Sequence, residues 1–220
     1  MKASSTILMA WVLAGSAVIG NAATFQNLDF ESAMQPLSPP SAPIAKAMPG
    51  WHAYIGETEQ TEVLFNSATG GAPYLGLFSP AIEVLQGNYT AVLGPSIMTS
   101  VSLSQSGVVP GDTESLTFLF RGSKLDNFFG VFMNDQRLPL VTLADGVGYS
   151  VLGADLSRFA GTDVTLKFSC FAVGQPNGAL LDSISFSPEP IPEPSTFALM
   201  GLSGALLCHR LWPKKKSKGL

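Results

Sequence analysis

Apolar and polar residues alternate in several short segments between residues 101 and 186. The apolar members are Val101 and Leu103; Leu116, Phe118 and Phe120; Val131 and Met133; Val164, Leu166, Phe168 and Cys170; and Leu180, Ile184 and Phe186. Stretches rich in Gly, Pro, Asn and Asp separate these segments: VVPGDTE, MNDQRLP and VGQPNG. Alternation with a period of two between such turns is typical of short antiparallel strands. The pattern predicts an all-β fold, an antiparallel β-sandwich or jelly roll, over residues 23–188.

Residues 1–22 follow a different pattern. A single positive charge at Lys2 precedes an apolar run from Ile7 to Ile19, and small residues follow up to Ala23. This order is typical of a secretory signal peptide, a helix that is removed after export, here after residue 22 or 23. The run is shorter than the ~20 residues that cross a bilayer, which favours a signal peptide over a retained N-terminal anchor.

The C-terminal segment, residues 189–220, combines a turn, an apolar stretch and a cluster of lysines: IPEPSTFALMGLSGALLCHRLWPKKKSKGL. The apolar stretch predicts a single transmembrane helix over about residues 196–212. Its length of about 24 Å is marginal against a hydrocarbon core of about 30 Å. The basic cluster at 214–218 suits the cytoplasmic side of the membrane and leaves the body outside. Its members are Lys214, Lys215, Lys216 and Lys218.

The order of these features resembles the PEP-CTERM sorting signal, also described as an ice-binding-protein C-terminal-type domain. The residues that carry the resemblance are the Pro-Glu-Pro motif at 192–194 and its continuation: Pro192, Glu193, Pro194, Ser195 and Thr196. The resemblance implies that an exosortase-type membrane protease recognises the tail and cuts near the motif. It also implies a bacterial protein of the cell surface or extracellular matrix that accompanies extracellular polysaccharide. Cys208, His209 and Arg210 interrupt the apolar stretch, so an uncut anchor remains an alternative.

Net charge differs between the ends and the body. Six of the twelve basic residues lie in the two terminal segments, while all sixteen acidic residues lie between Ala23 and Pro194, so the body carries a net charge of about −10. An acidic body without a basic face argues against nucleic acid and anionic membrane surfaces as partners. Cys170 is the single cysteine of the body, and its place in an alternating apolar series predicts a buried, unreactive thiol.

The last predicted strand contains a carboxylate among apolar residues. Alternation places Leu180, Asp182 and Ile184 on one face, so the Asp182 carboxylate is expected to be buried. A buried carboxylate must be paired, neutralised or hydrogen-bonded. One possibility is that Asp182 accepts hydrogen bonds from backbone N–H groups of a neighbouring loop.

The order of phrases along the body resembles galactose-binding-like jelly rolls, which include many carbohydrate-binding modules. The phrases span residues 24–188: FQNLDFES, PGWHAY, GNYTAVL, DLSRFAGTDVTLKFSCFA and GALLDSISFS. The resemblance implies a β-sandwich that often holds a structural calcium and sometimes binds sugar. In such modules, acids at the positions of Glu31 and Asp182 help to hold the calcium, which takes six to eight oxygen ligands. Calcium and loop capping both remain open for Asp182.

Aromatic residues are the candidates for contact with a polysaccharide. Trp51, Tyr54 and Phe128 could stack on sugar rings, because planar side chains offer an apolar face. Trp51, which follows Pro-Gly, also fits a core position. Phe128 and Phe129 are adjacent and are expected to face opposite ways, which would expose one of them.

Motifs of catalysis are absent from the sequence, which has no Gly-x-Ser-x-Gly, His-Glu-x-x-His or P-loop pattern. The sequence therefore predicts a non-catalytic, carbohydrate-binding-like domain. The alternatives are a structural matrix or adhesin protein without a sugar site and, least favoured, a glycan-active enzyme that uses two carboxylates.

Overall fold

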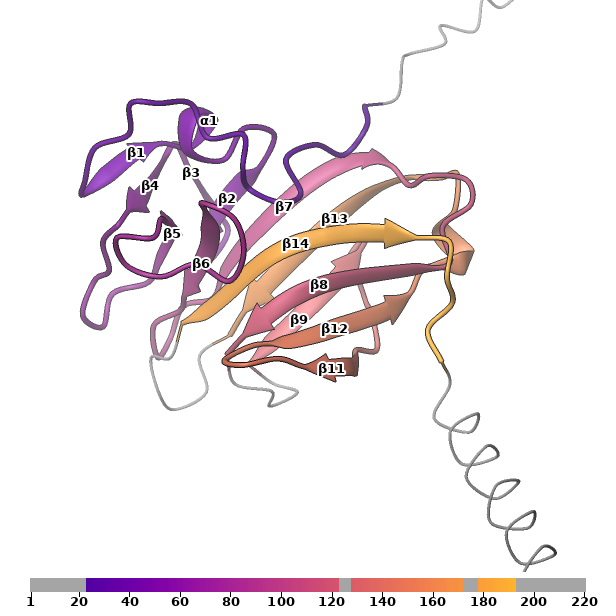
Figure 1. Cartoon of the computed structure of the whole chain (residues 1–220). Coiled ribbons are helices and arrows are strands. Elements are labelled where there is room, and N and C mark those ends of the chain that lie inside the picture. The colour runs from indigo at the N-terminus through magenta and orange to yellow at the C-terminus, as the bar shows by residue number, and fades with distance from the viewer. Residues whose placement is uncertain (1–22, 123–127, 172–177, 193–220) are drawn as a thin grey trace, which may run out of the picture.

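The computed structural model describes residues 23–122, 128–171 and 178–192. The predicted signal peptide, the sorting motif after Pro192, the predicted transmembrane helix and the basic cluster lie outside these residues. The strands of the described residues fall between Ser41 and Ser187 (Figure 1). None of the helices in this part has the length and apolarity needed to span a bilayer.

Two sheets form the body. The eight-stranded sheet has the order β1 (Ser41–Pro43), β4 (Glu62–Phe65), β5 (Tyr74–Phe78), β6 (Thr90–Gly94), β14 (Ala179–Ser187), β8 (Ser115–Arg121), β12 (Ser150–Asp155) and β11 (Val141–Asp145). The six-stranded sheet has the order β10 (Gln136–Arg137), β9 (Phe129–Met133), β13 (Asp163–Cys170), β7 (Val101–Val108), β2 (His52–Ile55) and β3 (Thr58–Gln60). Among the described strands, β4 and β5 pair in parallel and the other pairs are antiparallel.

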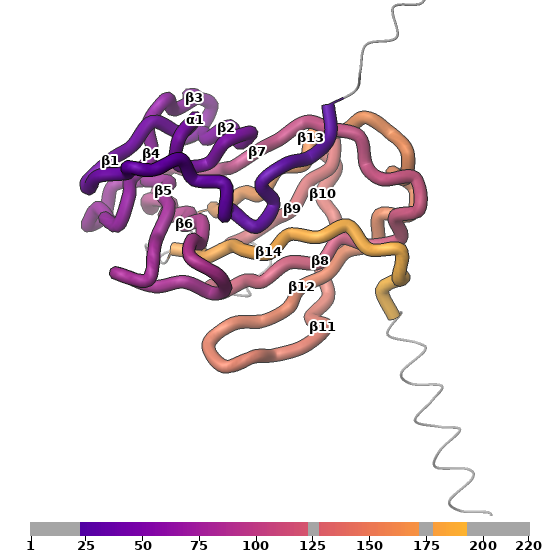
Figure 2. The backbone as a smooth tube through the Cα atoms, turned by 45° about the horizontal axis from the view of Figure 1, so that its top comes forward, coloured from indigo at the N-terminus to yellow at the C-terminus, as the bar shows by residue number. Residues whose placement is uncertain are grey.

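Helical structure is almost absent from the described residues. It consists of α1 (Ile44–Ala47) and a short 3-10 helix, η1 (Ser157–Phe159). Strands β1 to β5 gather at one end of the body, whereas β8, β12 and β11 form the other (Figure 2). The predicted all-β sandwich is confirmed.

The core lies between the two sheets and contains most of the predicted apolar series. Leu116, Phe118 and Phe120 enter it from β8, and Leu166, Phe168 and Cys170 enter it from β13. Burial raises the pKa of the Cys170 thiol above its ordinary value, because an apolar site disfavours the thiolate. The prediction of a buried cysteine is confirmed.

Strand β14 departs from the expected alternation. Leu181 lies in the core, whereas Leu180 belongs to a separate small cluster on the outer face. The pairing register with β8 shifts between Asp182 and Ser185, and Ser183 has a φ of 48°. Such a bulge inserts a residue and exchanges the two faces, which returns Ile184 to the core. The prediction that Leu180 and Asp182 share a face with Ile184 was therefore wrong.

Candidate functional site

A loop covers part of the outer face of the eight-stranded sheet. This loop, residues 79–89, connects β5 to β6. Its Leu85 packs on the small apolar cluster that contains Leu180, and its Glu83 forms an ion pair with Arg121 of β8. Asp182 is buried beneath this loop rather than in the main core, which is why an outward-pointing carboxylate is shielded from water.

Asp182 is hydrogen-bonded on both carboxylate oxygens. Its Oδ2 accepts a hydrogen bond from the Thr90 hydroxyl at 2.6 Å and one from the Gln86 N–H at 3.2 Å. Its Oδ1 accepts a hydrogen bond from the Ser183 N–H at 2.7 Å. Burial raises the pKa of Asp182 to about 6, although the hydrogen bonds act in the opposite direction.

Glu31 binds the same loop from the N-terminal part of the chain. Its Oε1 accepts hydrogen bonds from the N–H groups of Asn88 at 2.7 Å and Tyr89 at 3.0 Å. The Asn88 side-chain amide donates to Oε2 at 3.0 Å. Gly87 has a φ of 65°, and a Cβ at this position would overlap the Glu31 carboxylate. The two residues singled out as calcium ligands therefore hold one loop together.

The hydrogen-bond partners of Glu31 and Asp182 show how well this site suits calcium. The side-chain oxygens of Glu31 and Asp182 receive hydrogen bonds from N–H and O–H donors, whereas calcium requires six to eight oxygen ligands. Within the described ranges, no group of three or more His, Cys, Asp and Glu side chains could hold a metal ion. This arrangement fits loop capping and does not fit calcium, an inference that chelation can test.

Two of the three candidate aromatic residues lie in the core. Trp51 is 3% exposed, stacks on Phe30 with ring centroids 5.5 Å apart, and donates its indole N–H to the Asn27 carbonyl at 2.9 Å. Phe128 is 2% exposed, and Phe129 is also buried. The expectation that one of these adjacent rings is exposed was wrong, because Phe128 precedes β9, where strand alternation no longer sets side-chain direction. Neither Trp51 nor Phe128 offers a ring face to a ligand.

Tyr54, the third candidate, lies on the outer face of the six-stranded sheet. It is half-buried and stands opposite Ser102 of β7, which in turn stands opposite Ser169 of β13. The next row on this face consists of His52, Ser104, Lys167 and Phe132. Sequence reasoning missed this surface, although serine alternates with apolar residues in VSLSQSG.

We call this surface the serine face. It consists of Ser102, Ser104 and Ser106 of β7 and Ser169 of β13, with Tyr54 and His52 of β2 on one side and Lys167 of β13 and Phe132 of β9 on the other. Strand alternation turns the neighbouring residues Val101 and Leu103 into the core. The small hydroxyl side chains lie between larger aromatic and basic groups.

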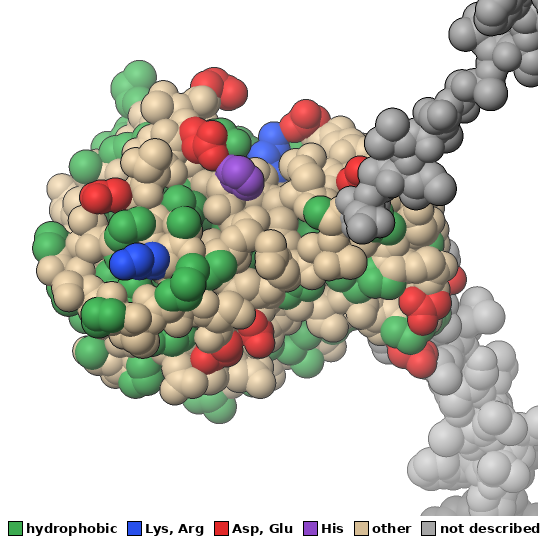
Figure 3. Space-filling model, turned by 90° about the horizontal axis from the view of Figure 1, so that it is seen from above, with side chains coloured by type: hydrophobic (Ala, Val, Ile, Leu, Met, Phe, Trp, Pro, Cys, Tyr) green, Lys and Arg blue, Asp and Glu red, His purple; other side chains and the backbone are tan. Residues whose placement is uncertain are grey.

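The charges on the serine face are paired. The Lys167 ammonium lies 5.3 Å from the Phe132 ring centroid and 2.5 Å from an Asp135 carboxylate oxygen. His52 Nδ1 lies 2.6 Å from Glu59 Oε1. In the view of Figure 3, charged side chains are few and lie scattered among hydrophobic and other groups. Ser102, Ser104 and Ser169 are only 8%, 8% and 5% exposed, whereas Ser106 is exposed. The serine face therefore presents rings and few accessible hydroxyls rather than a field of one sign.

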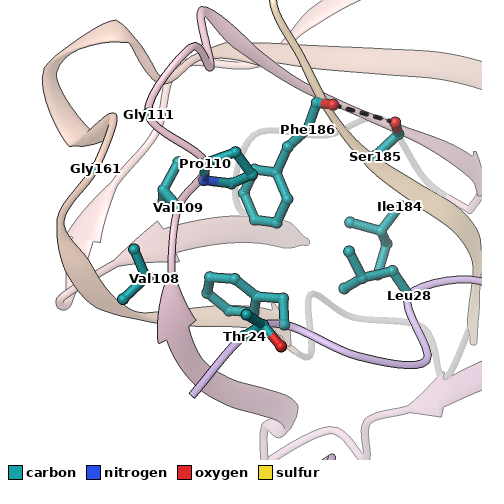
Figure 4. A pocket seen from close by; sticks show the side chains of 11 residues that line it. Thr24, Leu28, Val108, Val109, Pro110, Gly111, Gly161, Ile184, Ser185 and Phe186 are labelled. Atoms are coloured by element: carbon teal, nitrogen blue, oxygen red, sulfur yellow. Dashed lines mark hydrogen bonds between the residues drawn. The ribbon is translucent and has the colours of Figure 1, made fainter. Parts of the chain in front are cut away.

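A separate apolar groove of about 580 Å³ lies where the described chain begins (Figure 4). Phe25 and Phe186 line it, with ring centroids 5.0 Å apart. The other lining residues are Thr24, Leu28, Val108, Val109, Pro110, Gly111, Gly161, Ile184 and Ser185. Because most of these groups are apolar, the groove offers few hydrogen-bonding partners to a sugar.

Comparison with known proteins places the fold in context. No protein-family model matches the chain, and no curated protein matches it. Among solved structures, the fold is similar to TmCBM61 in complex with β-1,4-galactotriose, with a TM-score of 0.42, 12% identity, and coverage of 76% of this chain and 99% of that one. It is also similar to the K2 cleaved adhesin domain of Lys-gingipain, with a TM-score of 0.41, 14% identity, and coverage of 73% and 96%.

A third similar structure is CBM27-1 of Caldicellulosiruptor saccharolyticus in complex with mannohexaose. Its TM-score is 0.33 at 15% identity, with coverage of 55% of this chain and 84% of that one. At these values the similarity carries no argument about function, which therefore has to come from the residues of this chain.

Proposed function

We propose that this chain is an exported, non-catalytic protein that binds an extracellular polysaccharide through the serine face. The observation that carries the proposal is the position of Tyr54 and Phe132 on either side of a strip of serines. Aromatic rings stack on the apolar faces of sugars, and serine hydroxyls both donate and accept hydrogen bonds.

The spacing of the two rings favours an extended ligand. Three strand intervals separate β2 from β9 in the sheet, and neighbouring strands lie about 4.8 Å apart, so the two strands are roughly 14 Å apart. A single sugar ring cannot contact both strands at once. We therefore expect affinity to rise with the length of an oligosaccharide until it reaches from Tyr54 to Phe132.

The carboxylates near this face do not support catalysis. Glu59 lies on β3 and Asp135 follows β9, four strand intervals away. That separation is roughly 19 Å, whereas the two carboxyl groups of a glycosidase lie about 5 to 9.5 Å apart. Each carboxylate also has a basic partner, His52 for Glu59 and Lys167 for Asp135. These positions favour binding over hydrolysis.

Export and sorting form the second part of the proposal. The body is proposed to be a galactose-binding-like jelly roll that is carried to the cell surface or extracellular matrix. Its tail is proposed to insert in the inner membrane and to be cut there by an exosortase-type protease. Support comes from the tripartite tail in the sequence and from the position of Pro192. The residue before it, Ile191, packs beside Gly153, and Pro192 is exposed, so the motif begins at an accessible position.

A glycan array with residues 23–192 tests the binding proposal. Selective binding is expected, and Tyr54→Ala and Phe132→Ala should each weaken it by about tenfold, because truncating a central aromatic contact costs more than about 1 kcal/mol. Thr142→Ala on β11, exposed on the other sheet, is the matched control and should bind as wild type. Binding that survives both aromatic substitutions would exclude the serine face. Silence across the array would favour a matrix or adhesin protein without a sugar site.

Mass spectrometry of protein from the cell surface tests the sorting proposal. A mature chain that ends near Pro194 is expected. Recovery of the intact tail, including the four lysines, would instead indicate an uncut anchor.

A further inference from the structure

A second exposed surface lies on the outer face of the eight-stranded sheet, next to the part that loop 79–89 covers, because its Leu119 stands opposite Asp182. Leu119 of β8 stands opposite Val151 of β12, and both are half-buried. Leu143 of β11 is 38% exposed, and Ile191 lies next to it. We call these four residues, Leu119, Leu143, Val151 and Ile191, the apolar patch.

The chain leaves the body across this patch. The Ser115 hydroxyl donates a hydrogen bond to the Glu189 carbonyl at 2.6 Å, which holds the C-terminal connector against the end of β8. A Cβ added to Gly153 would lie 2.6 Å from Ile191 Cδ1 and 2.8 Å from Leu143 Cδ1. Glycine at this position therefore allows both side chains to lie directly over β12.

The connector leaves little distance between the patch and the predicted membrane segment. Four residues, 193–196, separate Pro192 from the apolar stretch that begins at Phe197. Fully extended, four residues span at most about 14 Å. A tail inserted in a bilayer would hold the patch close to the lipid surface, at an effective concentration of about millimolar or higher. Even a weak apolar contact becomes occupied at such a concentration.

We propose that the apolar patch rests on the surface of a neutral lipid bilayer while the tail is inserted. This inference rests on the membrane-inserted tail of the proposed function. The charges around the patch do not attract anionic lipid, because Asp155 lies on β12 and the Arg121 guanidinium of β8 is paired with Glu83. Acidic side chains are repelled by anionic headgroups.

Release of the body follows from the weakness of this contact. Four partly exposed apolar side chains bury too little area to hold a folded domain on lipid alone. Cutting the tail removes the tether and with it the high effective concentration. The body then leaves the membrane without a further conformational step.

Site-specific fluorescence tests the proposal. The chain from Ala23 to Leu220, with Cys208→Ser, is reconstituted in phosphatidylcholine vesicles and labelled with a polarity-sensitive dye at Leu143→Cys. Met98→Cys, which is 93% exposed on the turn between β6 and β7, gives the matched control. The remaining thiol, Cys170, is buried. Lipid-borne quenchers are expected to quench the dye at position 143 several-fold more than at position 98.

A double substitution and a control chain without the tail keep the outcomes distinct. The double substitution Leu119→Ser and Val151→Ser should reduce quenching at position 143 while flotation with the vesicles stays unchanged. Residues 23–192, which contain the strands described above, should neither float nor be quenched. Flotation with equal quenching at positions 143 and 98 would overturn docking and leave tail insertion intact.

Failure of the tail-containing chain to float would instead overturn the membrane insertion on which the inference rests. A concentration-dependent blue shift at position 143 without vesicles would show that a second copy covers the patch, which would also overturn lipid docking.

Discussion

Glu31 and Asp182 accept hydrogen bonds from the same loop, although one lies near the start of the body and the other lies in its last strand. Glu31 holds the N–H groups of Asn88 and Tyr89, and Asp182 holds the Gln86 N–H and the Thr90 hydroxyl. Because this loop covers an apolar cluster on the outer face of the eight-stranded sheet, the two carboxylates stabilise a surface that would otherwise be open to water.

Removal of the Glu31 carboxylate should destabilise the body. We expect Glu31→Ala to lower the free energy of unfolding of residues 23–192 by about 1–3 kcal/mol, because two backbone N–H groups lose their acceptor. Urea denaturation measures this difference. Glu57→Ala, in the exposed turn between β2 and β3, should change the free energy by less than about 0.5 kcal/mol. Equal effects of the two substitutions would contradict the role of Glu31.

Gly87→Ala should produce a similar loss by another route. A side chain at Gly87 would overlap the Glu31 carboxylate and would also adopt an unfavourable φ of 65°. Gly71→Ala isolates the second effect, because Gly71 has a φ of 92° and nothing within 4 Å of an added Cβ. We expect thermal unfolding to show a larger decrease in Tm for Gly87→Ala. A smaller decrease would mean that the loop can move away from Glu31.

Asp182 should make stability depend on pH. Burial raises its pKa to about 6 in the folded protein, against an ordinary value of 3.8 in the unfolded chain. Between these values the folded state binds a proton that the unfolded chain has released, so the free energy of unfolding falls as pH rises from about 4 to about 6. Asp182→Asn should lack this contribution. Stability curves of the two proteins that run parallel from pH 4 to pH 7 would refute the shifted pKa.

Chelation should leave the melting temperature unchanged. Hydrogen-bond donors of loop 79–89, β6 and β14 surround the carboxylates of Glu31 and Asp182. This leaves calcium without the oxygen ligands that it needs. Differential scanning fluorimetry of residues 23–192 in millimolar calcium and in chelator measures this directly. An increase of several degrees in calcium would show that the loop rearranges around a bound ion.

The sequence predicted the core better than the surface. Period-two alternation in β8 and β13 identified buried residues because each strand presents one face to the core. It failed in β14, where the bulge at Ser183 puts Ile184 on the opposite face from Leu180. A bulge depends on pairing with a neighbouring strand, and alternation within one segment contains no information about that pairing.

The candidate site was only partly accessible from the sequence for a related reason. Glu31 and Asp182 were identified individually, but their shared loop depends on contacts between distant segments. Tyr54 could not be told apart from Trp51 by residue type, since both are aromatic and lie three residues apart. Burial separated them, because Tyr54 lies on the outer face of β2 whereas Trp51 precedes that strand and packs on Phe30.

The position of β14 has a consequence for the timing of folding. This strand is the last of the described strands, yet it lies between β6 and β8 in the middle of the eight-stranded sheet. Until residues 179–187 become available, the sheet remains two separate halves, and loop 79–89 lacks the Asp182 carboxylate. Contacts of such high sequence separation form late and slowly. The order of the strands thus delays closure of the eight-stranded sheet until residues 179–187 have been synthesised.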